Sequence, residues 1–170
     1  MDRYDGFREF VLARQQALMR SAYLLTGDVH LAEDLMQSVL LKVANRWPRL
    51  VRHGTPEAYT RKALVNQYIS WQRRKQRRSP SADPPERRHA HDDATIDRIV
   101  LRKALIRITP RQRAVIVLRF YEDLSERETA EILGCSVGTV KSQTHHALGR
   151  LRTLAPELSE LFAETEEAGR

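Results

Sequence analysis

Residues 124–152 read LSERETAEILGCSVGTVKSQTHHALGRLR. Ser125 and Glu128 have the spacing of a capping box, in which a hydroxyl and a carboxylate satisfy backbone amides at the start of a helix. A helix is therefore predicted to begin directly after the serine. Ala130 is small enough for a crossing helix to approach, and Gly134 can adopt the left-handed conformation that ends a helix.

A second helix is predicted after this turn, because Ser136 can cap its first amides. Its inward stripe at helical spacing consists of Val140, Thr144, Ala147, Leu148 and Leu151. This second predicted helix contains no acidic residue. Two short helices joined by a tight turn, with a polar and basic outer face, are typical of a helix-turn-helix that reads duplex DNA. Two core helices of an ordinary bundle remain the alternative at this point.

The charge distribution also favours nucleic acid. The 170 residues carry a formal charge of +7, from 29 basic and 22 acidic side chains. A moderately basic surface also occurs without such a partner, so its distribution is more informative. Residues 61–78 contain seven Arg or Lys and no acid, whereas residues 156–170 contain five Glu and one Arg.

Several classes of protein are not indicated. The chain has no apolar signal-type start and no run long enough to cross a membrane, so we expect a cytoplasmic protein without membrane insertion. Cys135 stands alone and predicts neither an internal disulfide nor a Cys-rich zinc site. No phosphate-binding glycine loop, nucleophile elbow or zinc-protease motif is present, so neither an enzyme nor a cofactor is predicted. His89, His91, Asp92 and Asp93 lie in an aperiodic segment, and we expect no metal there.

The first part of the chain predicts three helices. One ends at Thr26-Gly27, and the next has an inward stripe of Leu31, Leu35, Val39, Val43 and Trp47 before Pro48 ends it. Leu41 lies off that stripe beside Asp34 and Gln37, which indicates either a partner surface or an ordinary exposed leucine.

The third helix is predicted from Pro56 to Arg78, with Ala58, Val65 and Ile69 facing inward. One outer flank comprises Tyr59, Asn66, Ser70 and Arg73, and the other comprises Tyr68, Trp71, Arg74, Lys75 and Arg78. Aromatic rings interleaved with cations suit single-stranded nucleic acid, since bases stack on rings while cations hold phosphates. Half-buried aromatics beside a solvated basic end are the alternative.

Residues 79–95 carry three prolines without apolar periodicity and predict a flexible linker. Further helices follow at 96–108 and after the Thr109-Pro110 capping sequence. We therefore predict an all-α chain of two small helical domains, 1–78 and 96–155, followed by an acidic tail at 156–170.

The chain resembles the extracytoplasmic-function (group 4) sigma factors of bacterial RNA polymerase, in the sigma-70 family. Three segments carry the resemblance: AEDLMQ at 32–37 continuing to Trp47, the helix from Tyr59 to Arg78, and residues 109–152 beginning TPRQR. The resemblance implies that 1–78 is similar to sigma domain 2 and 96–155 to sigma domain 4. A stand-alone helix-turn-helix regulator, which binds duplex DNA without polymerase, remains the alternative.

By this resemblance, the partners are promoter DNA and core RNA polymerase, through its β′ clamp helices and β flap. An anti-sigma protein is common in the family. The residues implied to bind polymerase are Asp34, Gln37 and Leu41. Those implied to bind the melted −10 strand are Tyr59, Asn66, Tyr68, Trp71, Arg73, Arg74 and Lys75. Ser70 stands where many relatives have Asp.

The second helix of the helix-turn-helix is implied to read the −35 element as duplex. The residues at its base- and phosphate-contacting positions are Thr139, Lys141, Ser142, Gln143, His145 and His146. The stretch from Gln143 to His146 departs from the arginine-rich pattern of many relatives. Fewer fixed cations there predict weaker phosphate contacts.

Overall fold

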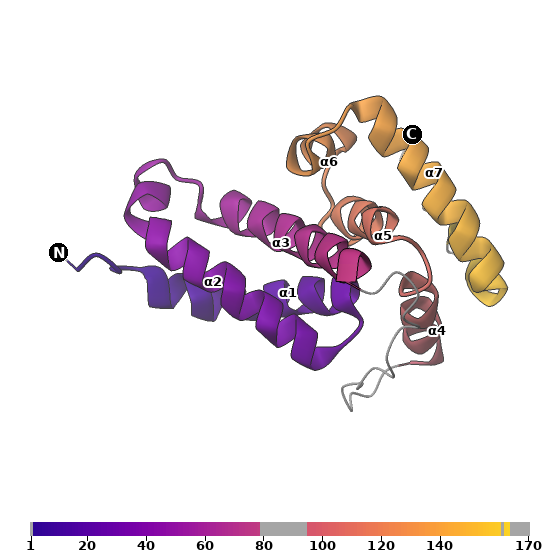
Figure 1. Ribbon diagram of the computed structural model, residues 1–170, viewed down its shortest axis with the longest axis horizontal. Coiled ribbons are helices and arrows are strands. Elements are labelled where there is room, and N and C mark those ends of the chain that lie inside the picture. Colours follow the sequence, from indigo (N-terminus) through magenta and orange to yellow (C-terminus); the bar gives the residue numbers. More distant parts are fainter. Residues whose placement is uncertain (1, 79–94, 161, 164–170) are drawn as a thin grey trace. The chain divides into compact units, whose positions relative to one another are not determined.

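The computed structural model describes residues 2–78, 95–160 and 162–163. All regular secondary structure in the described residues is helical (Figure 1), which confirms the predicted all-α class. The chain divides into two compact units, Met1–Arg88 and His89–Arg170, and the division falls among residues outside the described ranges. The predicted linker, except Thr95, also lies outside them. Each unit is therefore described by itself.

The N-terminal unit contains α1 (Phe7–Thr26), α2 (Val29–Arg52) and α3 (Pro56–Arg78). Gly27 ends α1 with a φ of 68°, and the Asp28 side chain caps α2 by accepting a hydrogen bond from the Leu31 amide at 3.0 Å. Pro56 is the first residue of α3, where a missing amide hydrogen costs nothing. The predicted helix end at Thr26-Gly27 and the predicted helix start at Pro56 are confirmed.

Trp47 is the anchor between α1 and α2. Its indole Nε1 donates a hydrogen bond to the Asp5 carbonyl at 2.7 Å. The rings of Phe7 and Phe10 each lie 5.2 Å from the Trp47 ring, measured between centroids. The buried face of α2 consists of Ala32, Leu35, Met36, Val39, Val43, Trp47 and Leu50. Aromatic packing and one polar contact thus join the start of the chain to the end of α2.

The prediction that Pro48 ends the second helix is wrong, because α2 continues to Arg52. Proline removes one amide donor from the helix. Trp47 and Leu50 on either side are only 4% and 7% exposed, and their burial favours continuing the helix. Leu31, predicted to face inward, is instead 39% exposed at the edge of the buried face.

The inward face of α3 also differs from the prediction. The buried residues are Thr60, Leu64, Val65 and Tyr68. Thr60, Leu64 and Tyr68 recur every four residues and form a single stripe, whereas Ala58 is exposed. The placement of Tyr68 on an outer flank is therefore wrong, since its side chain is fully buried.

The C-terminal unit contains α4 (Ile96–Leu105), α5 (Pro110–Ile116), the π-helix η1 (Val117–Tyr121), α6 (Glu126–Leu133), α7 (Val137–Leu154) and the short 3₁₀ helix η2 (Pro156–Leu158). Thr109 and Gln112 form the predicted capping box of α5. Among the described residues, no helix is both long and apolar enough to cross a membrane.

Helix α4 ends three residues before the predicted Ile108, and Arg113 accounts for the difference. This arginine is only 3% exposed, and its Nε donates a hydrogen bond to the Leu105 carbonyl at 2.7 Å. Its Nη2 donates to the Ile108 carbonyl at 3.4 Å. A buried cation from α5 thus donates hydrogen bonds to carbonyls at the end of α4, where the last carbonyls of a helix lack backbone amide donors.

The π-helix η1 leads from α5 toward α6. The Glu122 amide donates to the Val117 carbonyl at 2.9 Å, a bond that spans five residues. Asp123 then has a φ of 54°, which turns the chain before α6. After α7, Leu158 and Phe162 are 6% and 4% exposed, so part of the predicted acidic tail packs on the unit.

Candidate nucleic-acid interface

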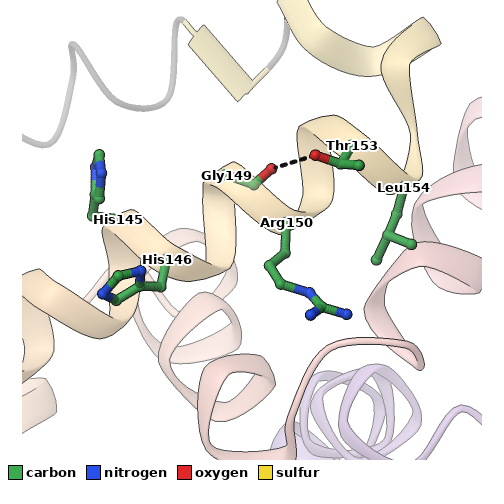
Figure 2. Close-up of a pocket in the computed structure, with 6 residues that line it drawn as sticks. All are labelled: His145, His146, Gly149, Arg150, Thr153 and Leu154. Carbon is green, nitrogen blue, oxygen red and sulfur yellow. Dashed lines mark hydrogen bonds between the residues drawn. The ribbon is translucent and has the colours of Figure 1, made fainter.

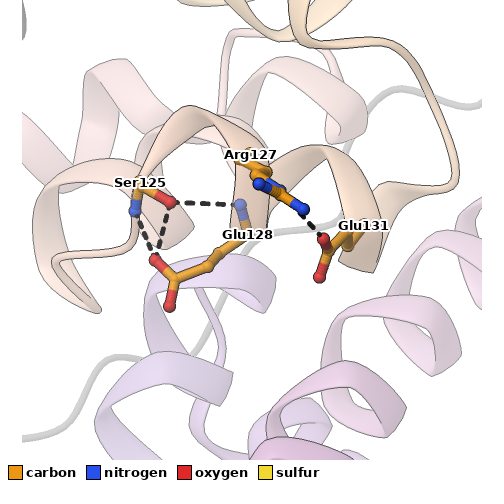
Figure 3. Close-up of polar contacts among 4 residues, drawn as sticks. All are labelled: Ser125, Arg127, Glu128 and Glu131. Carbon is orange, nitrogen blue, oxygen red and sulfur yellow. Dashed lines mark hydrogen bonds and ion pairs between the residues drawn. The ribbon is translucent and has the colours of Figure 1, made fainter.

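The helix-turn-helix begins with a complete capping box (Figure 3). Ser125 Oγ accepts a hydrogen bond from the Glu128 amide at 3.1 Å. Glu128 Oε2 accepts from the Ser125 amide at 2.8 Å and from its hydroxyl at 2.7 Å. These reciprocal bonds fix the first turn of α6, as the sequence predicts.

The turn between α6 and α7 is also as predicted. Gly134 ends α6 with a φ of 63°, a conformation that costs side-chain-bearing residues about 1 to 2 kcal/mol. Ser136 Oγ accepts a hydrogen bond from the Thr139 amide at 3.1 Å and caps α7. The two helices are therefore joined by a short turn whose ends are both held.

A small apolar cluster holds α6 and α7 on their scaffold. Val115 of α5, Ala130 of α6 and Val140 of α7 are buried together. Leu133 and Cys135 pack against them, so the lone cysteine is a packing residue at the turn. Because the inner face of α7 is committed to this core, its outer face is presented to solvent.

The outer face of α7 displays the residues predicted to contact duplex DNA. Lys141, Ser142, His145 and His146 are exposed, and Thr139 and Gln143 are partly exposed. Helix α7 contains no acidic residue. The ammonium of Lys141 lies 3.7 Å from a carboxylate oxygen of Glu126 on α6. The face thus offers hydrogen-bond donors, acceptors and cations, the groups that meet bases and phosphates.

Farther along α7, a surface hollow of about 380 Å³ extends this face (Figure 2). Its lining residues are His145, His146, Gly149, Arg150, Thr153 and Leu154. The two histidine rings lie 5.9 Å apart at 65° to each other. Arg150 is not among the predicted contacts, although it follows His146 by one helical turn and is exposed.

In the N-terminal unit, α2 and α3 border a second hollow of about 280 Å³. Its lining residues are Lys42, Tyr59, Lys62, Ala63, Asn66, Gln67 and Ser70. Tyr59 and Asn66, both predicted strand contacts, are thus brought together. Lys42 donates a hydrogen bond to Gln67, and the Arg46 guanidinium lies 5.4 Å from the Tyr59 ring centroid. Lys42 is not among the predicted contacts, because the approach of α2 to α3 is not visible in the sequence. Lys62 is not among them either, although it lies on α3 three residues after Tyr59 and four before Asn66, a spacing that places all three on one side of the helix.

The end of α3 carries the rest of the predicted strand contacts. Arg73, Arg74 and Lys75 are exposed, and Trp71 is partly exposed. Tyr68 is not available to a base, because it lies in the core. The candidate interface on this unit therefore combines the α2–α3 hollow with a cationic helix end.

The residues predicted to bind polymerase share one exposed face of α2. Asp34, Gln37 and Leu41 are all exposed, and Leu41 is 67% exposed. Their spacing of three and four residues places them in one row along the helix.

Within the described ranges, no cluster of three or more His, Cys, Asp or Glu side chains could hold a metal ion. His89, His91, Asp92 and Asp93 lie outside those ranges.

Comparison with known proteins identifies both units. The family described as sigma-70 region 2 matches residues 10–78, and that described as sigma-70, region 4 matches residues 98–151. The RNA polymerase sigma-E factor of Streptomyces coelicolor is 41% identical over 170 residues, covering 96% of this chain and 95% of the relative.

More distant relatives agree. The ECF RNA polymerase sigma factor SigE of Mycolicibacterium smegmatis is 34% identical, covering 83% of this chain and 59% of the relative. The sigma factor RpoE of Bartonella quintana, solved in complex with the anti-sigma factor NepR, has a TM-score of 0.73 at 27% identity. That match covers 87% of this chain and 95% of the solved one. The chain therefore belongs to the extracytoplasmic-function sigma factors of bacterial RNA polymerase, in the sigma-70 family.

Proposed function

We propose that the two units divide promoter recognition between them. As a sigma factor, the chain recruits core RNA polymerase to specific promoters and promotes DNA melting for transcription initiation. The observation that carries the division is the difference between the two surfaces. One surface is a helix-turn-helix whose second helix, α7, contains no acidic residue. The other is a hollow lined by aromatic and cationic side chains.

The C-terminal unit is assigned to the −35 element as duplex DNA. Its outer α7 face fits a major groove, where the first turns of a recognition helix meet base edges. The residues assigned to this contact are Thr139, Lys141, Ser142, Gln143, His145 and His146, with Arg150 added. Arg150 lies two turns beyond Gln143, where a cation suits a backbone phosphate.

The N-terminal unit is assigned to the melted −10 strand. Tyr59 and Asn66 offer a ring and an amide at the α2–α3 hollow, and Trp71 offers a second ring. Arg73, Arg74 and Lys75 supply the cations that hold phosphates. The exposed row of Asp34, Gln37 and Leu41 on α2 is assigned to the β′ clamp helices of polymerase, and the C-terminal unit to the β flap.

Residues 79–95 are assigned the role of a tether. Each DNA contact can be weak on its own, because binding at one unit raises the effective concentration of the other at its element. Recruitment needs no bond chemistry in this chain.

We place the chain in the cytoplasm, associated with the nucleoid when it is bound to polymerase, since its relatives are polymerase factors. The Bartonella complex supports regulation by an anti-sigma protein.

A regulator that binds duplex DNA without polymerase is not favoured. The Streptomyces coelicolor relative aligns along both units, and the region 2 match spans the whole α2–α3 surface. A stand-alone helix-turn-helix would leave that surface without a role.

Run-off transcription with purified core enzyme and genomic promoter fragments tests the proposal. We expect initiation at defined start sites that requires this chain, and loss of that initiation when either promoter element is scrambled. Core enzyme initiating no more specifically with the chain than without it would contradict the proposal.

A further inference from the structure

The ion pair between Glu126 and Lys141 links the two helices of the helix-turn-helix, and Lys141 lies on the outer face of α7 that is assigned to DNA above. Glu126 is the first residue of α6, and its Oε2 lies 3.7 Å from the Lys141 ammonium on α7. The Glu126 side chain is 26% exposed and that of Lys141 is 64% exposed. The carboxylate is thus partly enclosed, while the cation is largely exposed to solvent.

The other carboxylates of α6 have different partners (Figure 3). Glu128 accepts hydrogen bonds from Ser125 in the capping box. Glu131 lies 3.5 Å from Arg127, one turn away on the same helix. Glu126 therefore differs from Glu131 in directing its charge to the recognition helix, although both are glutamates of the same short segment.

We propose that Glu126 restrains binding of the −35 element by competing with DNA phosphate for Lys141. This inference rests on the proposed function. A phosphate that engages Lys141 must displace the carboxylate or accept its repulsion, since both anions seek the same ammonium. The pair thereby lowers the affinity of the upstream contact, so that promoter binding depends on the tether to polymerase. Glu126 acts through Lys141 and is a positioning residue.

The expected effect is modest, because exposed ion pairs are weak. Removing the charge of Glu126 should tighten closed-complex binding by about two- to fivefold. The salt dependence should become steeper, because Lys141 then displaces counterions from DNA without first losing a protein partner.

The test uses holoenzyme reconstituted from core polymerase and the full chain, on a promoter fragment that supports run-off transcription. Closed-complex dissociation constants are measured for Glu126→Gln, Glu131→Gln, Lys141→Ala and the Glu126→Gln/Lys141→Ala double variant, at salt from about 50 to 200 mM. Glu131→Gln is the matched control, because it neutralises a carboxylate on α6 that does not pair with α7.

We expect Glu126→Gln to bind more tightly and with a steeper salt slope, Glu131→Gln to match the wild type, and the gain to vanish in the Lys141→Ala background. Glu126→Gln binding no more tightly than Glu131→Gln, or a gain that persists without Lys141, overturns the proposal. Failure of the wild-type holoenzyme to initiate specifically would instead reject the proposed function, and the two failures are therefore distinguishable.

Discussion

At the scale of single residues, Tyr68 and Trp71 of α3 have contrasting surroundings three positions apart. Tyr68 is fully buried between the helices of the N-terminal unit, whereas Trp71 is partly exposed beside the cationic helix end. Both are aromatic residues close to arginines in the sequence, so composition does not distinguish them. Burial therefore indicates a structural role for Tyr68, whereas the partly exposed Trp71 remains the proposed contact for the melted strand.

We expect Trp71→Ala to impair promoter opening more than closed-complex binding, because a ring that stacks on unpaired bases acts only after melting. Permanganate reactivity of unpaired thymines measures opening, and mobility shift on duplex promoter DNA measures closed binding. Arg73→Ala provides a cationic comparison on the same helix. Equal losses in both assays for Trp71→Ala would count against stacking on the melted strand.

Tyr68→Ala should instead destabilise the fold. Truncating a fully buried aromatic ring removes apolar contacts and leaves a cavity, at a cost of about 3 to 5 kcal/mol. Thermal unfolding followed by circular dichroism should show a lower midpoint than for wild type or Trp71→Ala. A Tyr68→Ala variant of normal stability that fails only in promoter opening would restore Tyr68 to the DNA contacts.

At the scale of helices, the turn of the helix-turn-helix depends on backbone conformation at one glycine. A Cβ added at Gly134 would meet no atom within 4 Å, yet its φ is 63°. Gly149 lies in the interior of α7, and a Cβ there also meets nothing. Substitution by alanine at both positions therefore separates backbone strain from packing.

We expect Gly134→Ala to lower the free energy of unfolding by about 1 to 2 kcal/mol, because alanine is strained in the left-handed region. Gly149→Ala should raise it by about 0.5 to 1 kcal/mol, since alanine loses less backbone entropy in a helix. Urea unfolding of the full chain, followed by fluorescence and circular dichroism, measures both. Shifts of the same sign would show that local backbone conformation does not control this turn.

The same scale shows which helix ends are predictable. Asp28, Thr109, Ser125 and Ser136 cap helices through their own side chains, so the local sequence predicts where those helices begin. The carbonyls at the end of α4 accept hydrogen bonds from Arg113, which belongs to α5. No local sequence pattern in α4 predicts this contact. Likewise, α2 passes through Pro48 because its neighbours are buried.

At the scale of the whole molecule, the division into two helical units and the exposed face of α7 follow from the sequence. Periodicity identifies which residues share a face of a helix, and an acid-free outer face marks a surface suited to DNA. The α2–α3 hollow does not follow, because Lys42 and Tyr59 line one hollow only when α2 packs against α3. Sharing one helix is not sufficient for prediction either, because Tyr68 of α3 lies in the core and Arg150 of α7 is not among the predicted contacts.

The proposed tether makes a quantitative prediction about linker length. Doubling the 17 residues of 79–95 with a Gly/Ser insertion should lower the effective concentration of one unit at its element by about threefold, because that concentration falls as the −3/2 power of length. Supplying the two units as separate polypeptides should remove tethering entirely and abolish initiation at promoters that need both elements. Run-off yield at limiting polymerase measures both effects. Full activity of the separated units would show that promoter recognition does not require their covalent connection.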